Sequence, residues 1–226
     1  MKLVSVTIDG HRLESAADAT ILAAARQAGI EIPTLCFCDA LGPYSACRVC
    51  VVEVKGADRL LPACGTRVAD GIEVVTDSPL LADIRRTLVE LILSDHEKDC
   101  LACAKWGGCK LQALAKQLGV TRNALSHQRI GRAVRTVPVG RAVGAARPAD
   151  AIVRDRSACI LCGNCVRVCR EVQKVSALAL EGRGFAMRVA TPFDLPLAET
   201  PCVECKQCVR VCPTGAMANE SINHQP

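Results

Sequence analysis

Residues 159–169 read CILCGNCVRVC and residues 202–213 read CVECKQCVRVCP, so the spacing C-x2-C-x2-C-x3-C occurs twice in the chain. We call residues 159–169 the early run and residues 202–212 the late run. The cysteines are Cys159, Cys162, Cys165 and Cys169 in the early run and Cys202, Cys205, Cys208 and Cys212 in the late run. This repetition is the most specific signal in the sequence.

The chemistry of iron explains the repeated spacing. A C-x2-C-x2-C loop places three thiolates around a 4Fe-4S cube, and the fourth cysteine, three residues later, ligates the neighbouring cluster. Two such runs therefore complete each other. The spacing predicts one 4Fe-4S cluster on Cys159, Cys162, Cys165 and Cys212, and another on Cys202, Cys205, Cys208 and Cys169. Zinc is disfavoured, because paired C-x2-C zinc sites need a longer separating arm and would leave cysteines over.

One difference separates the two runs. The late run continues into Pro213, as the bacterial cluster pattern does, whereas the early run continues into Arg170. This weakens the match slightly without removing a ligand.

Upstream of the repeat lies a group with H-x3-C-x2-C-x5-C spacing, formed by His96, Cys100, Cys103 and Cys109. Three thiolates and an imidazole fit zinc as well as an iron-sulfur cluster. A cluster between two other cluster groups would close an electron-transfer gap that redox-inert zinc would leave open, so we interpret the group as a 4Fe-4S site. A neutral imidazole ligand should raise its potential, by analogy with Rieske centres. Helices are expected on both sides, over residues 78–95 with Ser78 as N-cap, and over residues 109–119.

Nearest the N-terminus is a group with C-x10-C-x2-C-x13-C spacing, formed by Cys36, Cys47, Cys50 and Cys64. Around it, residues 3–8, 49–56 and 71–76 are rich in β-branched residues, and residues 18–30 predict a short helix closed by Gly29. A mixed sheet beside a cysteine loop favours a 2Fe-2S site, with structural zinc as the alternative. Cys38 lies two residues from Cys36, and we interpret it as an unligated thiol.

Composition places the chain in the cytoplasm. The 226 residues include 16 cysteines, and Asp9, His11 and Arg12 interrupt the apolar stretch that a signal peptide needs. No uncharged apolar run approaches the roughly 18 to 20 residues of a membrane span. Thiols stay reduced in the cytosol, where cysteine clusters usually bind metal.

The order of these groups resembles the N-terminal iron-sulfur region of iron-iron hydrogenases. Over the first two sites it is similar to the large iron-sulfur subunit of respiratory complex I and to the small iron-sulfur subunit of diaphorase modules. The resemblance implies an α+β chain with a β-grasp 2Fe-2S domain, a small helical His-Cys domain and a two-cubane ferredoxin-like domain. The expected boundaries are residues 1–78, 79–121 and 151–226, with a basic linker over 122–150. In this family the residue that matches Cys38 is not a usual ligand.

The sequence departs from the iron-iron hydrogenase pattern in a way that indicates a relay without a catalytic centre of its own. Neither hydrogen-activating cysteines nor a nucleotide-binding signature is present in the sequence. We expect one 2Fe-2S and three 4Fe-4S clusters that carry single electrons between a flavin-bearing NAD(P)H-oxidising subunit and a catalytic subunit, either a hydrogenase or a formate dehydrogenase. A diffusing multi-cluster ferredoxin and a zinc-bearing scaffold are the alternatives.

The arginine-rich stretch from Arg122 to Arg156 is interpreted as a solvated connector, and next as a docking segment for an acidic partner. Nucleic-acid binding is disfavoured, because the net charge is only +5 and no aromatic residues are interleaved.

Overall fold

The computed structural model describes residues 2–96, 100–101, 103, 105–120 and 152–219. The chain forms two compact units. We call Met1–Leu91 with Leu114–Thr121 the N-terminal unit, and Ile92–Ala113 with Arg122–Pro226 the C-terminal unit. The expected linker over 122–150 lies outside the described residues, and the domain boundaries stay a prediction.

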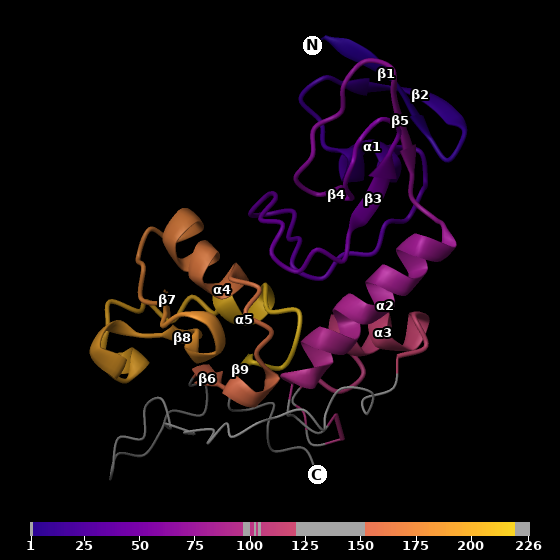
Figure 1. Cartoon of the computed structure of the whole chain (residues 1–226). Helices are drawn as coiled ribbons and strands as arrows, with labels where there is room; N and C mark the ends of the chain where they lie inside the picture. The colour runs from indigo at the N-terminus through magenta and orange to yellow at the C-terminus, as the bar shows by residue number, and fades with distance from the viewer. Residues whose placement is uncertain (1, 97–99, 102, 104, 121–151, 220–226) are drawn as a thin grey trace. The chain divides into compact units, whose positions relative to one another are not determined.

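A five-stranded sheet forms the centre of the N-terminal unit (Figure 1). Its strands are β1 (Leu3–Ile8), β2 (His11–Ala16), β3 (Val51–Val54), β4 (Leu61–Pro62) and β5 (Ile72–Val75). Their order is β2-β1-β5-β3-β4, in which β1 and β5 are parallel and the other neighbours are antiparallel. The sheet combines strands from both sides of the cysteine loop, so it holds both ends of that loop.

The hairpin between β1 and β2 turns at Asp9 and Gly10, whose φ values are 49° and 80°. Two consecutive positive φ values give the tight turn whose twist suits a β-hairpin. The Asp9 carboxylate accepts hydrogen bonds from the Thr76 N–H at 2.7 Å and the Thr76 hydroxyl at 2.5 Å. This contact fixes the turn against the end of β5.

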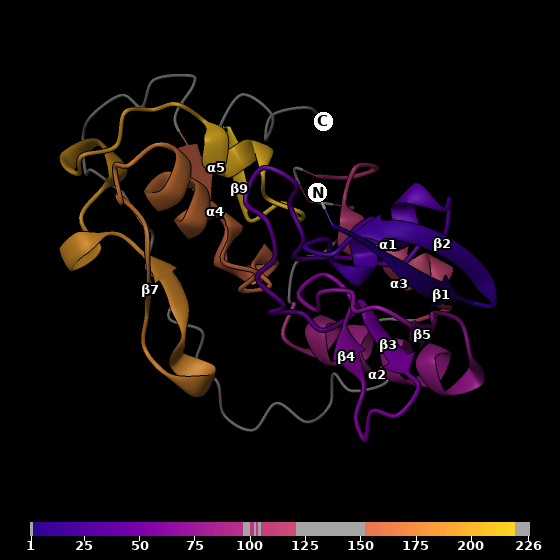
Figure 2. The same cartoon turned by 90° about the horizontal axis from the view of Figure 1, so that it is seen from above.

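Helix α1 (Ile21–Gln27) packs on the sheet (Figure 2). The Thr20 hydroxyl caps its first turn by accepting from the Ala23 N–H at 3.2 Å, and Gly29 closes it with a φ of 73°. Ile21 and Leu22 are buried with the inward residues of β1. The short helix expected over residues 18–30 is confirmed.

The helices expected around His96 are also present, as α2 (Pro79–Ser94) and α3 (Lys110–Gln117). The Ser78 hydroxyl accepts from the Leu81 N–H at 3.2 Å, which confirms the predicted N-cap. The buried face of α2 consists of Leu81, Arg85 and Val89. The guanidinium of Arg85 lies inside because its Nη2 donates to the Val51 carbonyl at 2.8 Å.

Two small antiparallel sheets frame the C-terminal unit, β6 with β9 and β7 with β8. The early run follows β6 and the late run precedes β9, so the β6–β9 pairing brings the two ends of the repeat together. The strands are β6 (Ile152–Arg154), β7 (Ala179–Glu181), β8 (Arg188–Ala190) and β9 (Met217–Asn219). The short helices are η2 (Arg156–Ala158), α4 (Asn164–Arg167), the π-helix η3 (Val168–Val172), η4 (Gly184–Ala186), η5 (Pro192–Asp194), η6 (Leu197–Glu199) and α5 (Gln207–Arg210).

The architecture is therefore a mixture of helices and strands, as the sequence predicts. Among the helices in the described part of the chain, none has both the length and the apolar character needed to span a bilayer.

Candidate metal centres

Four thiols of the N-terminal unit gather into hydrogen-bonded pairs, Cys36 with Cys47 and Cys50 with Cys64. The hydrogen bond from Cys36 lowers the pKa of Cys47 to about 6, and the bond from Cys50 lowers the pKa of Cys64 to about 6. The pKa values of Cys36 and Cys50 rise in turn, because each donates to its partner and is buried. One sulfur of each pair is thus prepared to be a thiolate, the form that binds metal.

The surroundings of this site also favour negative sulfur. The Cys47 N–H donates to the Cys36 sulfur at 3.4 Å, and the Ser45 hydroxyl lies 3.4 Å from the Cys64 sulfur. Burial lowers the pKa of the Arg85 guanidinium, and Cys50 is one of the groups that act in the opposite direction. A buried cation therefore lies near Cys50.

Cys38 occupies a different position. It forms an isolated β-bridge with Gly42, and its carbonyl accepts from the Leu41 N–H at 3.0 Å. Cys36 is the residue of the two that contacts Cys47. This arrangement suits Cys36 as a ligand, and the ligand role itself stays a prediction.

The cysteines that follow His96 lie near one another in the C-terminal unit. Cys103 donates its N–H to the Cys100 carbonyl at 3.2 Å. Burial raises the pKa of Cys109, and the charges of Cys103 and Cys100 raise it further. His96 is buried, with a 6% exposed fraction. Residues 97–99, 102 and 104 are outside the described residues.

This site lies against the end of the late run. A Cβ atom added to Gly215 would lie 2.5 Å from the Cys103 sulfur, which is closer than real Cβ contacts allow. The Lys105 ammonium donates to the Cys212 carbonyl at 3.3 Å. Gly215 therefore permits the Cys103 thiol to approach the segment that carries Cys212. Sequence reasoning missed this role, and the only signal for it was a glycine three residues after a predicted ligand.

The early and late runs exchange their fourth cysteines around two cavities. We call the first the early cavity, and its cysteines are Cys159, Cys162, Cys165 and Cys212. We call the second the late cavity, and its cysteines are Cys169, Cys202, Cys205 and Cys208. This is the grouping that cross-ligation requires. The ligand assignments remain predictions of the sequence.

The backbone follows the same path in both runs. Leu161 and Glu204 precede the second cysteine with φ values of 53° and 51°. Gly163 and Lys206 follow it with φ values of 76° and 58°, as the N-caps of α4 and α5. A non-glycine residue with positive φ is uncommon and carries a conformational cost. The left-handed residues curl each loop, so that its three cysteines line one cavity.

Cross-connections hold the end of the late run at the early cavity. The Thr214 hydroxyl donates to the Ala158 carbonyl at 2.7 Å and lies 3.8 Å from the Cys212 sulfur. The Asp155 N–H donates to the Ala216 carbonyl at 2.8 Å. These bonds extend the β6–β9 pairing toward the cysteines.

The donor set of both cavities fits an iron-sulfur cluster. Burial raises the pKa of Cys159 and Cys165 in the early cavity and of Cys202 and Cys208 in the late cavity, that of Cys208 to about 12. Neighbouring cysteines add to each of these shifts, and iron would remove the cost by displacing the thiol protons. Over the described residues, no three His, Cys, Asp or Glu side chains are gathered as for a single metal ion.

Backbone N–H groups also point to the sulfurs. The Leu161 N–H donates to the Cys159 sulfur at 3.5 Å, and the Ala177 N–H donates to the Cys169 sulfur at 3.3 Å. Such donors stabilise thiolates and are among the features that set cluster potentials.

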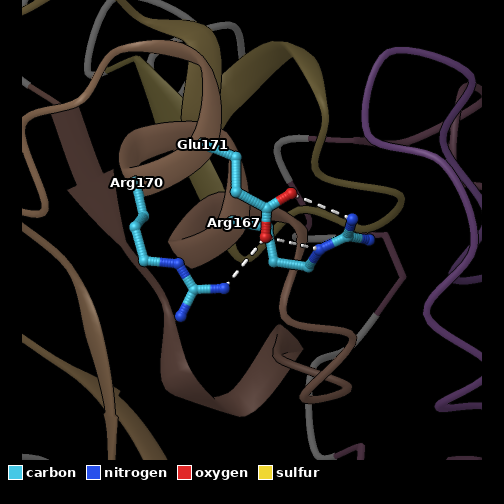
Figure 3. A network of polar contacts seen from close by, with 3 residues as sticks. All are labelled: Arg167, Arg170 and Glu171. Carbon is cyan, nitrogen blue, oxygen red and sulfur yellow. Dashed lines mark hydrogen bonds and ion pairs between the residues drawn. The ribbon is translucent and has the colours of Figure 1, made fainter.

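A charged network stabilises the π-helix that carries Cys169 (Figure 3). Arg167 holds both oxygens of the Glu171 carboxylate, from Nε at 3.1 Å and Nη2 at 3.0 Å. Arg170 donates to the same carboxylate at 2.9 Å. The hydrogen bonds from Arg167 and then Arg170 lower the pKa of Glu171. Sequence reasoning missed this network, whose only signal was the i, i+4 spacing of Arg167 and Glu171.

One interpretation of the sequence is wrong in part. The arginine-rich stretch is not a solvated connector throughout, because Arg154 belongs to β6 and lines the early cavity. Arg156 begins η2, three residues before Cys159. A run of arginines does not reveal which members the fold places at a cavity.

Three family models match successive parts of the chain. Residues 1–79 match a 2Fe-2S iron-sulfur cluster binding domain, and residues 85–124 match the NADH-ubiquinone oxidoreductase-G iron-sulfur binding region. Residues 158–216 match a 4Fe-4S dicluster domain. Ferredoxin-type 2Fe-2S and 4Fe-4S domains are thus confirmed, and the individual cluster count stays a prediction.

The chain is similar over nearly its whole length to known proteins. It is 40% identical to the NADP-reducing hydrogenase subunit HndD of Solidesulfovibrio fructosivorans, covering 96% of this chain and 36% of that protein. It is 32% identical to the NADH-ubiquinone oxidoreductase 75 kDa subunit of Reclinomonas americana, covering 96% of this chain and 30% of that protein. The chain thus spans about a third of the length of each of these relatives.

A solved structure, the NAD+-reducing [NiFe]-hydrogenase in the H2-reduced state, contains a chain with a TM-score of 0.81 and 32% identity. The match covers 99% of this chain and 90% of that one. These similarities confirm the resemblance that the cysteine motifs predict.

Proposed function

We propose that this chain, which belongs to the iron-sulfur protein family that includes a chain of the NAD+-reducing [NiFe]-hydrogenase, is an electron-relay subunit of an NAD(P)-linked oxidoreductase complex. A hydrogenase is the first candidate for the catalytic partner, and a formate dehydrogenase is the second. The other partner is a flavin-bearing subunit that oxidises NAD(P)H. We place the complex in the cytoplasm, where free thiols persist.

The observation that carries the proposal is the contact between two cysteine sites in the C-terminal unit. The Cys103 sulfur lies against Gly215, and Lys105 binds the Cys212 carbonyl. Cys212 in turn belongs to the early cavity, which shares the crossed runs with the late cavity. Three sites therefore follow one another, and electron tunnelling, which falls steeply with distance, requires such proximity.

The residues that would hold the clusters are those that the sequence predicts. Cys36, Cys47, Cys50 and Cys64 would hold a 2Fe-2S cluster, and His96, Cys100, Cys103 and Cys109 a 4Fe-4S cluster. The early and late cavities would each hold one further 4Fe-4S cluster. When bound, these groups accept and release one electron at a time, so a flavin partner must first divide the electron pair of a hydride.

The finer domain assignments belong to the same proposal. We assign residues 1–78 to a β-grasp domain, residues 79–121 to a His-Cys domain and residues 151–226 to a two-cubane ferredoxin-like domain. The parallel pairing of β1 with β5 and the packing of α1 on the sheet support the first assignment.

Metal content tests the proposal first. Anaerobically purified chain should contain about 14 irons, from one 2Fe-2S and three 4Fe-4S clusters. Stoichiometric zinc with about four fewer irons would exclude a cluster at His96 and favour the scaffold alternative.

Electron transfer tests it second. The chain alone should accept electrons from dithionite but should oxidise neither NADH, hydrogen nor formate. In the assembled complex, Cys103→Ser should stop electron flow between the partners while each partner still reacts with an artificial dye. A chain that turns over NADH or hydrogen alone, or a Cys103 variant that carries electrons normally, would contradict the relay.

A further inference from the structure

Arg154 is a half-buried cation at the early cavity. It lies on β6 opposite Met217 and lines the cavity together with Cys159, Cys162 and Cys212. The backbone pairing continues beyond Arg154, because the N–H of the next residue, Asp155, donates to the Ala216 carbonyl. Arg154 is therefore part of the cavity wall, and its charge interacts with that of Cys159.

Two nitrogens of this guanidinium are left to bind something in the cavity. Nη1 donates to the Val189 carbonyl. Nε and Nη2 are buried and have no hydrogen-bond partner in the part of the chain that the structure describes. Burying a charged donor without a partner is costly, and an arginine has five N–H groups to satisfy. The cavity that Arg154 lines is the space in which these donors can find an acceptor.

Nearby carboxylates do not neutralise Arg154. Glu181 and Asp194 form ion pairs with Arg188, that of Glu181 at 2.8 Å. Burial is the largest cause that lowers the pKa of Arg154, and the charges of Arg156 and Arg188 act in the same direction. Cys159 and Asp194 act in the opposite direction, and the resulting pKa is about 10. The side chain therefore stays protonated at neutral pH, and the sulfurs of a bound cluster would be the negative groups that its positive charge attracts.

We propose that Arg154 donates hydrogen bonds from Nε and Nη2 to the sulfur atoms of the cluster in the early cavity and thereby raises that cluster's reduction potential. The proposal rests on the proposed function, which places a 4Fe-4S cluster there. Thiolates and cluster sulfides are the acceptors that such a cavity offers. Arg154 is a potential-setting residue and carries no electron itself.

The physical reason lies in the charge of the two redox states. One electron arrives from the reductant, dithionite in the test below, and leaves to the next acceptor, while no bond forms or breaks and Arg154 keeps its proton. The reduced state carries one more negative charge, so a fixed cation with two N–H donors stabilises it more than the oxidised state. Removal of that cation should therefore make reduction harder at this cluster alone.

The test compares the full-length chain with three variants in redox titrations monitored by electron paramagnetic resonance. Arg154→Gln removes the charge, and Arg154→Lys keeps the charge but loses the fork of donors. Arg183→Gln removes the same charge from an exposed position of the same unit. Iron content is measured for every variant.

Arg154→Gln should lower the equilibrium constant for one-electron reduction of a single cubane about tenfold, which corresponds to a fall of ~59 mV. Arg154→Lys should give a smaller fall, and Arg183→Gln should give none. The step that moves should be the one that Cys162→Ser also perturbs.

The possible results distinguish a failure of the proposed relay function from a failure of the proposed role of Arg154. Low iron in the unmodified chain would overturn the proposed function itself. Full iron with unchanged potentials in Arg154→Gln would overturn the role of Arg154, as would an equal shift in Arg183→Gln. If Arg154→Gln loses iron, Arg154→Lys decides the matter: a shifted potential at full iron supports the role, and an unshifted one overturns it.

Discussion

The early and late runs share a cysteine spacing and a backbone path, yet the cavities that they line differ. Three of the four early-cavity cysteines are buried, and Arg154 lies in the wall of that cavity. In the late cavity Cys205 is exposed, and Glu204 contributes negative charge beside Cys202. Spacing therefore determines which thiols meet, whereas neighbouring residues determine the solvent exposure and charge around them.

The two loops also solve the same backbone problem with different residues. After the second cysteine the chain turns left-handed, at Gly163 in the early run and at Lys206 in the late run. Glycine adopts this conformation freely, whereas lysine does so at a cost. The late loop is thus the more strained of the two.

The largest effect is expected when a fourth cysteine, which each run contributes to the other run's cavity, is removed. Cys169→Ser should remove or alter the cluster held by Cys202, Cys205 and Cys208, and Cys212→Ser should do the same to the cluster on the early run. Each change should cost up to about four irons per chain. Iron analysis with electron paramagnetic resonance measures this loss. If Cys169→Ser altered only the cluster of the early run, the exchange of fourth cysteines would be contradicted.

A smaller effect is expected at Gly215, which follows the late run and lies against the Cys103 sulfur. Gly215→Ala adds a Cβ 2.5 Å from the Cys103 sulfur, so it should destabilise the chain by about 1–3 kcal/mol and perturb the His96 site. Gly108→Ala is the matched control, because nothing lies within 4 Å of its added Cβ. Denaturation curves and the spectrum of the His96 site measure both. Equal effects of the two changes would rule out the close approach.

The difference in backbone strain predicts opposite changes in the free energy of unfolding. Gly163→Ala should destabilise the early loop by about 1 kcal/mol, because it places a Cβ on a left-handed residue. Lys206→Gly should relieve a similar strain in the late loop, so it should either stabilise the chain or destabilise it by less than about 1 kcal/mol. Unfolding of the metal-loaded chain measures both values, and destabilisation by Lys206→Gly that exceeds that of Gly163→Ala would refute the comparison.

The smallest effect concerns the N-terminal unit, where two cysteines compete for one ligand position. Cys38→Ser should leave the 2Fe-2S absorption and resonance signals unchanged, whereas Cys36→Ser should abolish or alter them. The reason is that Cys36 contacts Cys47, while Cys38 is held in its bridge with Gly42. The reverse result would move the ligand by two residues.

Much of the fold follows from local sequence rules. The Asp9–Gly10 hairpin, the helix capped by Thr20 and the helix capped by Ser78 all occur where turn and capping residues predict them. These features depend on a few neighbouring residues, so sequence alone is sufficient. The cysteines of the early and late runs also line the two cavities in the predicted groups, because the C-x2-C-x2-C-x3-C spacing determines the geometry of each loop.

Features that depend on distant residues were not predictable. Leu80 and Leu91 recur at helical spacing in α2 but are more than half exposed. The buried face of α2 instead includes Arg85, whose place there depends on its bond to Val51. The position of Arg154 at the early cavity depends on β9 and on the Val189 carbonyl, which lie far along the chain. The role of Gly215 depends on Cys103, more than a hundred residues earlier.

The most direct test of the relay is a crystal structure of the anaerobically purified full chain with anomalous scattering collected at the iron and zinc edges. We expect four separate iron sites and no zinc, with Cys212 bonded to the cluster of the early run and Cys169 bonded to that of the late run. Zinc at His96, or a run that closes on its own fourth cysteine, would contradict this expectation.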